Sequence, residues 1–134
     1  MEDSENQRMN ENALCPGLGD YLIAQARNNY WSNQRLHSAC LRLPAPEYYA
    51  NRPSFFGSIH IHLDYIVFVD WLYLERLTGE QYLPADVGDE LHSELAPLVE
   101  DQVTADRALI EYCATATPET LASKVSFKLL DGTQ

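Results

Sequence analysis

The chain has 134 residues, enough for one domain and too few for two of ordinary size. Hydrophobic residues make up 46% and charged residues 22%, proportions typical of a globular chain rather than a disordered or fibrous one. The formal net charge of -11 disfavours proteins that neutralise phosphate backbones, so no nucleic-acid partner is expected. No segment reaches the roughly 18 apolar residues of a membrane span, so no membrane partner is expected.

The first residues of the chain are polar and lack a helix-capping pattern. We therefore expect a flexible N-terminal tail over residues 1–16 and a helical domain over residues 17–134. The start of the sequence is acidic, the opposite of a secretory signal, so we expect a cytoplasmic protein. Cys15, Cys40 and Cys113 lie far apart without CxxC spacing, which argues against a disulfide framework.

The first predicted helix begins at Asp20, which can cap it, and ends before Pro44 because proline cannot continue a helix. Its apolar residues recur at three- and four-residue steps and predict one buried stripe: Leu22, Ala26, Tyr30, Leu36 and Cys40.

The second predicted helix runs from Phe55 to Leu77, with Ser54 as its cap and Gly79 as its stop. It is apolar nearly all round, which favours a central, deeply packed position. The run at residues 66–69 is also compatible with a strand, but the whole stretch is much longer than a typical strand.

A loop over Pro84 to Glu90 precedes a third predicted helix, which begins between Ser93 and Pro97 and ends near Thr115. Residues 125–129 then alternate apolar and polar side chains, and the turn signal Asp131-Gly132 follows. The sequence therefore predicts an all-α protein with three helices and a short C-terminal strand.

The acidic residues are concentrated in one part of the sequence. Residues 79–120 contain ten acids and one base, whereas residues 13–78 contain five of each. A solvated helix face explains this concentration, and a surface for a cation or a basic partner is the alternative.

Two pairs of side chains have helical spacings that occur in catalytic or metal sites. His60 and Asp64 are four residues apart, which suits either an oriented imidazole or a hydrogen bond on a helix surface. His37 and Cys40 are three apart, which suits either two metal ligands or a surface histidine beside a core cysteine. Four aromatic residues are candidates for a ligand pocket or for the core: Tyr30, Trp31, Trp71 and Tyr73.

Four blocks of sequence, at residues 30–36, 54–60, 70–77 and 117–132, resemble the DinB/YfiT-like superfamily in residues and order. The resemblance covers roughly Leu18 to the last residue. It implies an up-down four-helix bundle, and it implies that this chain stops before the fourth helix.

Members of this family usually carry a divalent metal, such as zinc or nickel, held by one histidine of the second helix and an HxxxH pair of the fourth. The resemblance places the second-helix ligand at Tyr65, facing the inside of the bundle, and the HxxxH pair beyond Gln134. His62 is three residues earlier and shares a helix face with Tyr65, so these two residues are the candidate cofactor-binding face. One histidine and one tyrosine are too few ligands, so we expect no metal or other cofactor in this chain.

The functional expectation is a DinB-like protein related to metal-dependent thiol S-transferases, without a complete metal site of its own. The resemblance implies a low-molecular-weight thiol as the partner in such a reaction. The alternative is a non-catalytic binding or self-association module, in which a homodimer covers an exposed apolar groove.

Overall fold

The computed structural model describes residues 17–129, and helices are its only regular elements over that range. Three of them are long: α2 (Leu18–Arg42), α4 (Ile59–Thr78) and α5 (Leu95–Thr115). Two are short: α3 (Ala45–Tyr48) and α6 (Pro118–Ala122). The all-α prediction is confirmed for these residues, whereas the predicted tail over 1–16 and the turn at Asp131-Gly132 lie outside them. None of the helices in this range is long and apolar enough to cross a membrane.

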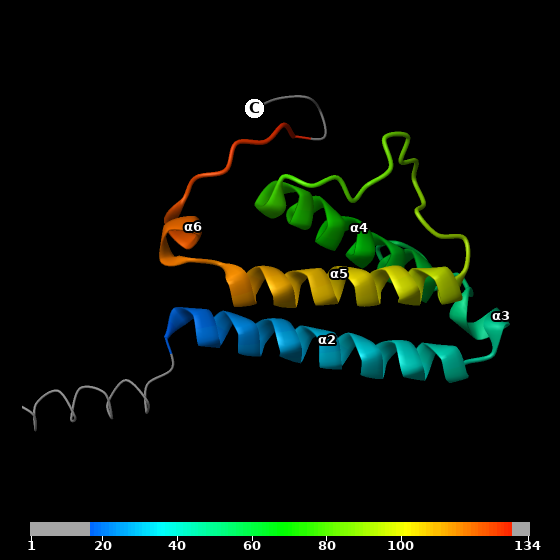
Figure 1. Cartoon of the computed structure of the whole chain (residues 1–134). Coiled ribbons are helices and arrows are strands. Elements are labelled where there is room, and N and C mark those ends of the chain that lie inside the picture. Colours follow the sequence, from blue (N-terminus) through cyan, green and yellow to red (C-terminus); the bar gives the residue numbers. More distant parts are fainter. Residues whose placement is uncertain (1–16, 130–134) are drawn as a thin grey trace, which may run out of the picture.

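The long helices do not alternate in direction as an up-down bundle requires. Helix α2 runs opposite to α5, whereas α4 and α5 run the same way (Figure 1). The hydrogen bonds between the two segments show the same parallel direction. Asp64, near the start of α4, bonds to His92, and the later residue Asp70 bonds to the later residue Gln102. Residues 79–94, called the crossover below, return the chain along α4. The up-down prediction is therefore corrected to an up-down-down order, which a connection of this length permits.

Helix boundaries agree with the prediction at the C-terminal ends and differ at two N-terminal ends. Helix α2 is capped by Gly17, whose N–H donates to Asp20 Oδ2 at 3.3 Å, so Asp20 lies within the first turn. Helix α4 begins four residues later than predicted because Gly57 has a positive φ of 91°. Ser58, rather than Ser54, accepts the Ile61 N–H at 3.2 Å. Gly79 ends α4 at a φ of 75°, as predicted.

Helix α5, rather than α4, is the central element. It packs against both α2 and α4, and its buried residues recur at helical steps: Leu95, Leu98, Gln102, Ala105 and Asp106. The main apolar cluster combines Leu98 with Val67 of α4 and Cys40 of α2. Helix α4 leaves one side uncovered, where Tyr73 is 56% exposed.

A network of amides and carboxylates, called the polar seam below, joins α2, α4 and α5. Asp106 is 2% exposed and accepts hydrogen bonds from Asn29 at 3.1 Å and from Asn33 at 3.0 and 3.1 Å. Gln102 Nε2 donates to both Asp106 and Asp70, at 3.0 and 2.8 Å. Because these groups are satisfied only in one alignment of the helices, the seam fixes their register.

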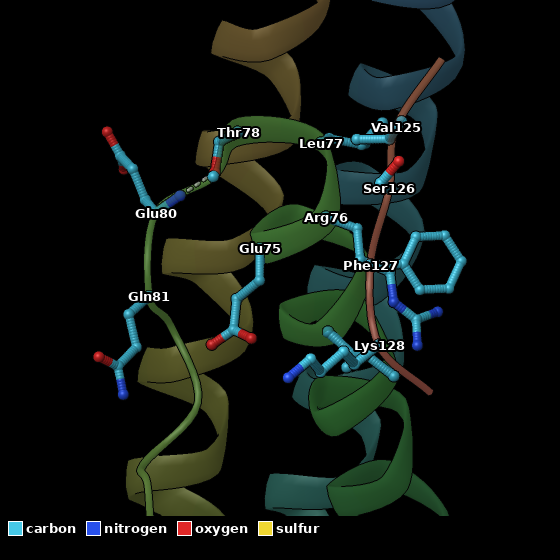
Figure 2. Close-up of a pocket in the computed structure, with 12 residues that line it drawn as sticks. Glu75, Arg76, Leu77, Thr78, Glu80, Gln81, Val125, Ser126, Phe127 and Lys128 are labelled. Atoms are coloured by element: carbon cyan, nitrogen blue, oxygen red, sulfur yellow. Dashed lines mark hydrogen bonds between the residues drawn. The ribbon is translucent and has the colours of Figure 1, made fainter. Parts of the chain in front are cut away.

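The predicted strand over residues 125–129 is an extended segment without ladder partners among residues 17–129. It follows α6, which the sequence pattern did not predict, and lies beside the last turns of α4 (Figure 2). The Arg76 guanidinium lies 4.0 Å from the centre of the Phe127 ring, a cation–π contact that holds the segment there. A side-chain contact therefore holds this segment against α4.

Two carboxylates in the polar seam have raised pKa values. Burial raises the pKa of Asp70, the hydrogen bond from Gln102 partly offsets this, and the charge of Asp106 raises it further. Burial likewise raises the pKa of Asp106 despite its hydrogen bonds. A carboxyl group whose pKa is higher in the folded state stabilises the fold when protonated, and this contribution is lost as pH rises through the folded pKa.

Asp70→Asn should therefore increase the free energy of unfolding at pH 7, because the neutral amide removes a buried charge beside Asp106. Below about pH 4 the difference from the wild type should shrink, since Asp70 is then protonated in both states. Urea denaturation at both pH values measures this. Glu100→Gln is the control, because it removes one negative charge at an exposed position of the same bundle. Equal effects of the two variants at pH 7 would contradict the prediction.

Candidate functional site

Two carboxylates of α4 hold the crossover against this helix. Glu75 Oε1 accepts the N–H groups of Tyr82 and Leu83 at 2.8 and 2.6 Å. Asp64 accepts the N–H groups of Leu91 and His92 at 2.8 and 3.0 Å. Because 3.6 residues make one turn, eleven residues make about three turns and place Asp64 and Glu75 on the same face. The crossover is thereby fixed near both of its ends.

His92 joins the end of the crossover to two helices. Its Nδ1 lies 2.8 Å from Asp64 Oδ1 and its Nε2 lies 2.5 Å from Asp101 Oδ2, both at hydrogen-bond distance. His92 is 8% exposed, so both contacts of its ring are shielded from water. A buried imidazole bonded to two carboxyl groups therefore fixes the start of α5 on α4.

His60 forms a second buried link to the same loop. Its Nε2 donates to the His92 carbonyl at 2.6 Å, because a carbonyl can only accept. In the neutral ring Nδ1 is then the acceptor for the Tyr48 hydroxyl at 2.8 Å. Burial raises the pKa of Tyr48 and keeps this hydroxyl a donor. His60 and Asp64 are 2% and 4% exposed, and each bonds to partners in other segments. The expected hydrogen bond between them on a helix surface is therefore corrected.

A cavity of about 380 Å³, called the aromatic pocket below, lies between α4 and the end of the crossover. Residues 88–91 form one wall, and the other lining residues are Phe56, Ile61, Asp64, Tyr65 and Phe68. The Tyr65 ring lies 4.6 Å from that of Phe56 and 6.1 Å from that of Phe68, centre to centre. Three aromatic rings therefore line up along one side of an apolar cavity that carboxylates border.

The candidate residues His62 and Tyr65 both lie beside the Phe56 ring. Its centre is 5.0 Å from the His62 ring and 4.6 Å from the Tyr65 ring. Tyr65 is nevertheless 48% exposed and lines the aromatic pocket, so the expectation that it faces the inside of the bundle is corrected. His62 Nδ1 donates to the Ser58 carbonyl of its own turn at 2.7 Å.

This face does not fit the divalent metal that the resemblance implies. Its ligand position holds the tyrosine phenol instead of an imidazole, and one nitrogen of His62 is already bonded within the helix. Over residues 17–129 no group of three His, Cys, Asp or Glu side chains is arranged to hold a metal ion.

Other candidates from the sequence are placed apart from this pocket. His37 is buried beside Cys40 rather than at the surface, and burial lowers the pKa of its imidazole. Trp71 packs against the core cluster, whereas Trp31 and Tyr73 are exposed. The concentration of acids on 79–120 is mostly a solvated surface, but Asp106 is a core residue.

A second, more open cavity of about 540 Å³ lies at the end of α4 (Figure 2). Glu75, Arg76 and Lys128 are among its lining residues, and both signs of charge are present. The Glu75 carboxylate is already engaged by two backbone N–H groups, and the Arg76 guanidinium by the Phe127 ring. These side chains serve to attach neighbouring segments, so the aromatic pocket is the better candidate site.

Sequence reasoning missed the residues that shape the site: His92, Asp101 and the backbone of residues 88–91. No local sequence signal marks His92, because its partner Asp64 is 28 residues away. No family model matches the chain, and no curated protein or solved structure is significantly similar to it.

His92→Ala should lower the free energy of unfolding by about 1–3 kcal/mol, because it leaves Asp64 and Asp101 without their shared partner. His62→Ala is the matched control, since the hydrogen bond of His62 lies within its own helical turn, and it should cost less than about 1 kcal/mol. Urea denaturation measures both. An equal loss of unfolding free energy in the two variants would show that the His92 hydrogen bonds do not stabilise the fold more than the local bond of His62 does.

Proposed function

We propose that the chain is a DinB-like helical binding module whose ligand is a small apolar molecule held in the aromatic pocket. One observation carries this proposal: the cavity between α4 and the crossover is lined by Phe56, Tyr65 and Phe68, and its opposite wall is tied to α4. Ligand sites are typically concave, mostly apolar and already formed before binding. The pocket has these properties.

The size and rigidity of the pocket support this function. Its volume of about 380 Å³ lies within the range of small-molecule sites. The wall at Leu91 cannot move without breaking its 2.8 Å hydrogen bond to Asp64, which is 4% exposed. A wall that is held in place reduces the entropy lost when a ligand binds.

The resemblance adds a catalytic alternative, a thiol S-transferase that uses a metal. Such an enzyme would consume a low-molecular-weight thiol together with an electrophile when zinc or nickel is supplied. The binding proposal expects no thiol consumption above the uncatalysed rate. Metal-dependent turnover that Tyr65→Phe abolishes would favour the enzyme over the binding module.

Self-association is the second candidate, and exposed aromatic residues on and just before α4 favour it. Tyr65 and Tyr73 of α4 are 48% and 56% exposed, and Phe55, which precedes the helix, is 91% exposed. Such exposure is unusual for aromatic side chains of a monomer. Sedimentation velocity at several concentrations distinguishes the two candidates. A concentration-dependent dimer favours self-association, and a constant monomer favours the ligand-binding module.

Phe68→Ala should weaken binding of an environment-sensitive apolar dye by about tenfold, because it removes one side of the pocket. Tyr73→Ala is the control: this aromatic residue is exposed on the same helix and does not line the pocket. Fluorescence titration of both variants measures the affinities. Equal dye affinity in the wild type and Phe68→Ala would contradict the proposed site.

A further inference from the structure

We infer that the ligand of the aromatic pocket is an amphipathic cation, with an apolar body against the three rings and a positively charged group at Glu90 and Asp89. This inference rests on the proposed function and adds the charge of the ligand to it. It follows from the charges around the cavity and from the availability of each carboxylate.

The charged residues that line the pocket are all acids. Asp64, Asp89 and Glu90 line it, and among residues 17–129 no Lys, Arg or His side chain does. Asp64 is 4% exposed, and its two oxygens are already engaged by the N–H groups of Leu91 and His92 and by the His92 ring. Asp89 and Glu90 lie on the exposed side of the same wall, and the Glu90 side chain is 51% exposed. These two charges are therefore available to a ligand.

Glu90 has one weak neighbour among the described residues. Its Oε1 lies 3.5 Å from His60 Nε2, a nitrogen that is already bonded to the His92 carbonyl at 2.6 Å. The shorter bond satisfies that N–H, which leaves the carboxylate of Glu90 with free acceptor capacity. A cation at the mouth of the pocket could donate to it.

The aromatic wall suits the apolar body of such a ligand. The rings of Phe56, Tyr65 and Phe68 form a row in which neighbouring planes are tilted by 35° and 26°. A row of rings offers apolar surface for a hydrocarbon body. An anionic ligand would instead meet the two carboxylates of Asp89 and Glu90 at the same wall. A bare metal ion would find too few oxygen ligands in so apolar a cavity.

The negative charge of the surrounding surface also favours a cationic ligand. Residues 79–120 carry ten acids and one base, and this stretch includes the wall at residues 88–91. A surface of one sign raises the local concentration of ions of the opposite sign and accelerates their association. The effect is weakened by salt over a Debye length of about 8 Å at physiological ionic strength.

Three probes with one phenylbutyl body test the inference: 4-phenylbutylamine, 4-phenylbutanol and 4-phenylbutyrate, titrated by calorimetry against the full chain. The amine should bind about two- to fivefold more tightly than the alcohol, the range of one exposed charge contact, and the carboxylate should bind weakest. Raising the salt concentration should reduce the preference for the amine.

The double variant Asp89→Asn, Glu90→Gln should lose this preference while it binds the alcohol as well as the wild type does. Glu94→Gln, which removes an exposed acid that does not line the pocket, should keep it. Equal affinity for amine and alcohol in the wild type would overturn the inference and leave the proposed binding function standing. No binding of any probe would overturn both. A preference that survives the double variant would also overturn the inference.

Discussion

Two carboxylates of one helix, Asp64 and Glu75, hold a long irregular connection in a fixed path. Each accepts two backbone N–H groups of the crossover, which would otherwise need water or a strand as a partner. Because the two residues are three helical turns apart on one face, the crossover must lie along α4. This path lets α5 begin near the start of α4 and run in the same direction. The parallel order of α4 and α5, the position of His92 and the wall of the aromatic pocket all depend on it.

The molecule uses buried charge in two separate ways. At the crossover, carboxyl groups accept backbone N–H groups and contact the His92 ring, so their oxygens are engaged and the loop is fixed. In the polar seam, Asp70 and Asp106 accept hydrogen bonds from neutral amides, burial raises the pKa of both, and the charge of Asp106 raises that of Asp70 further. The seam therefore sets the register of the helices at some cost in stability, whereas the crossover clamp contributes to stability and to the shape of the pocket.

The sequence predicted the three long helices because their apolar periodicity and their ends at Pro44 and Gly79 are local signals. It did not predict the polar seam, because Asn29 and Asn33 look like solvated residues until their partner Asp106 is known. It placed the start of α4 at Ser54, since nothing local distinguishes that serine from Ser58 except the backbone conformation of Gly57. For the site, it named Tyr65 and the shared face with His62. The second wall could not be predicted, because its docking depends on Asp64, which is far away in sequence.

The most direct test of the crossover clamp is amide hydrogen exchange of the crossover, measured residue by residue in the wild type, Asp64→Asn and Glu75→Gln. The clamp predicts that Asp64→Asn accelerates exchange at Leu91 and His92, that Glu75→Gln accelerates it at Tyr82 and Leu83, and that the helices keep their protection in both. If these four amides already exchange in the wild type as fast as unbonded loop amides, the crossover is not held by the two carboxylates and the pocket has no fixed second wall.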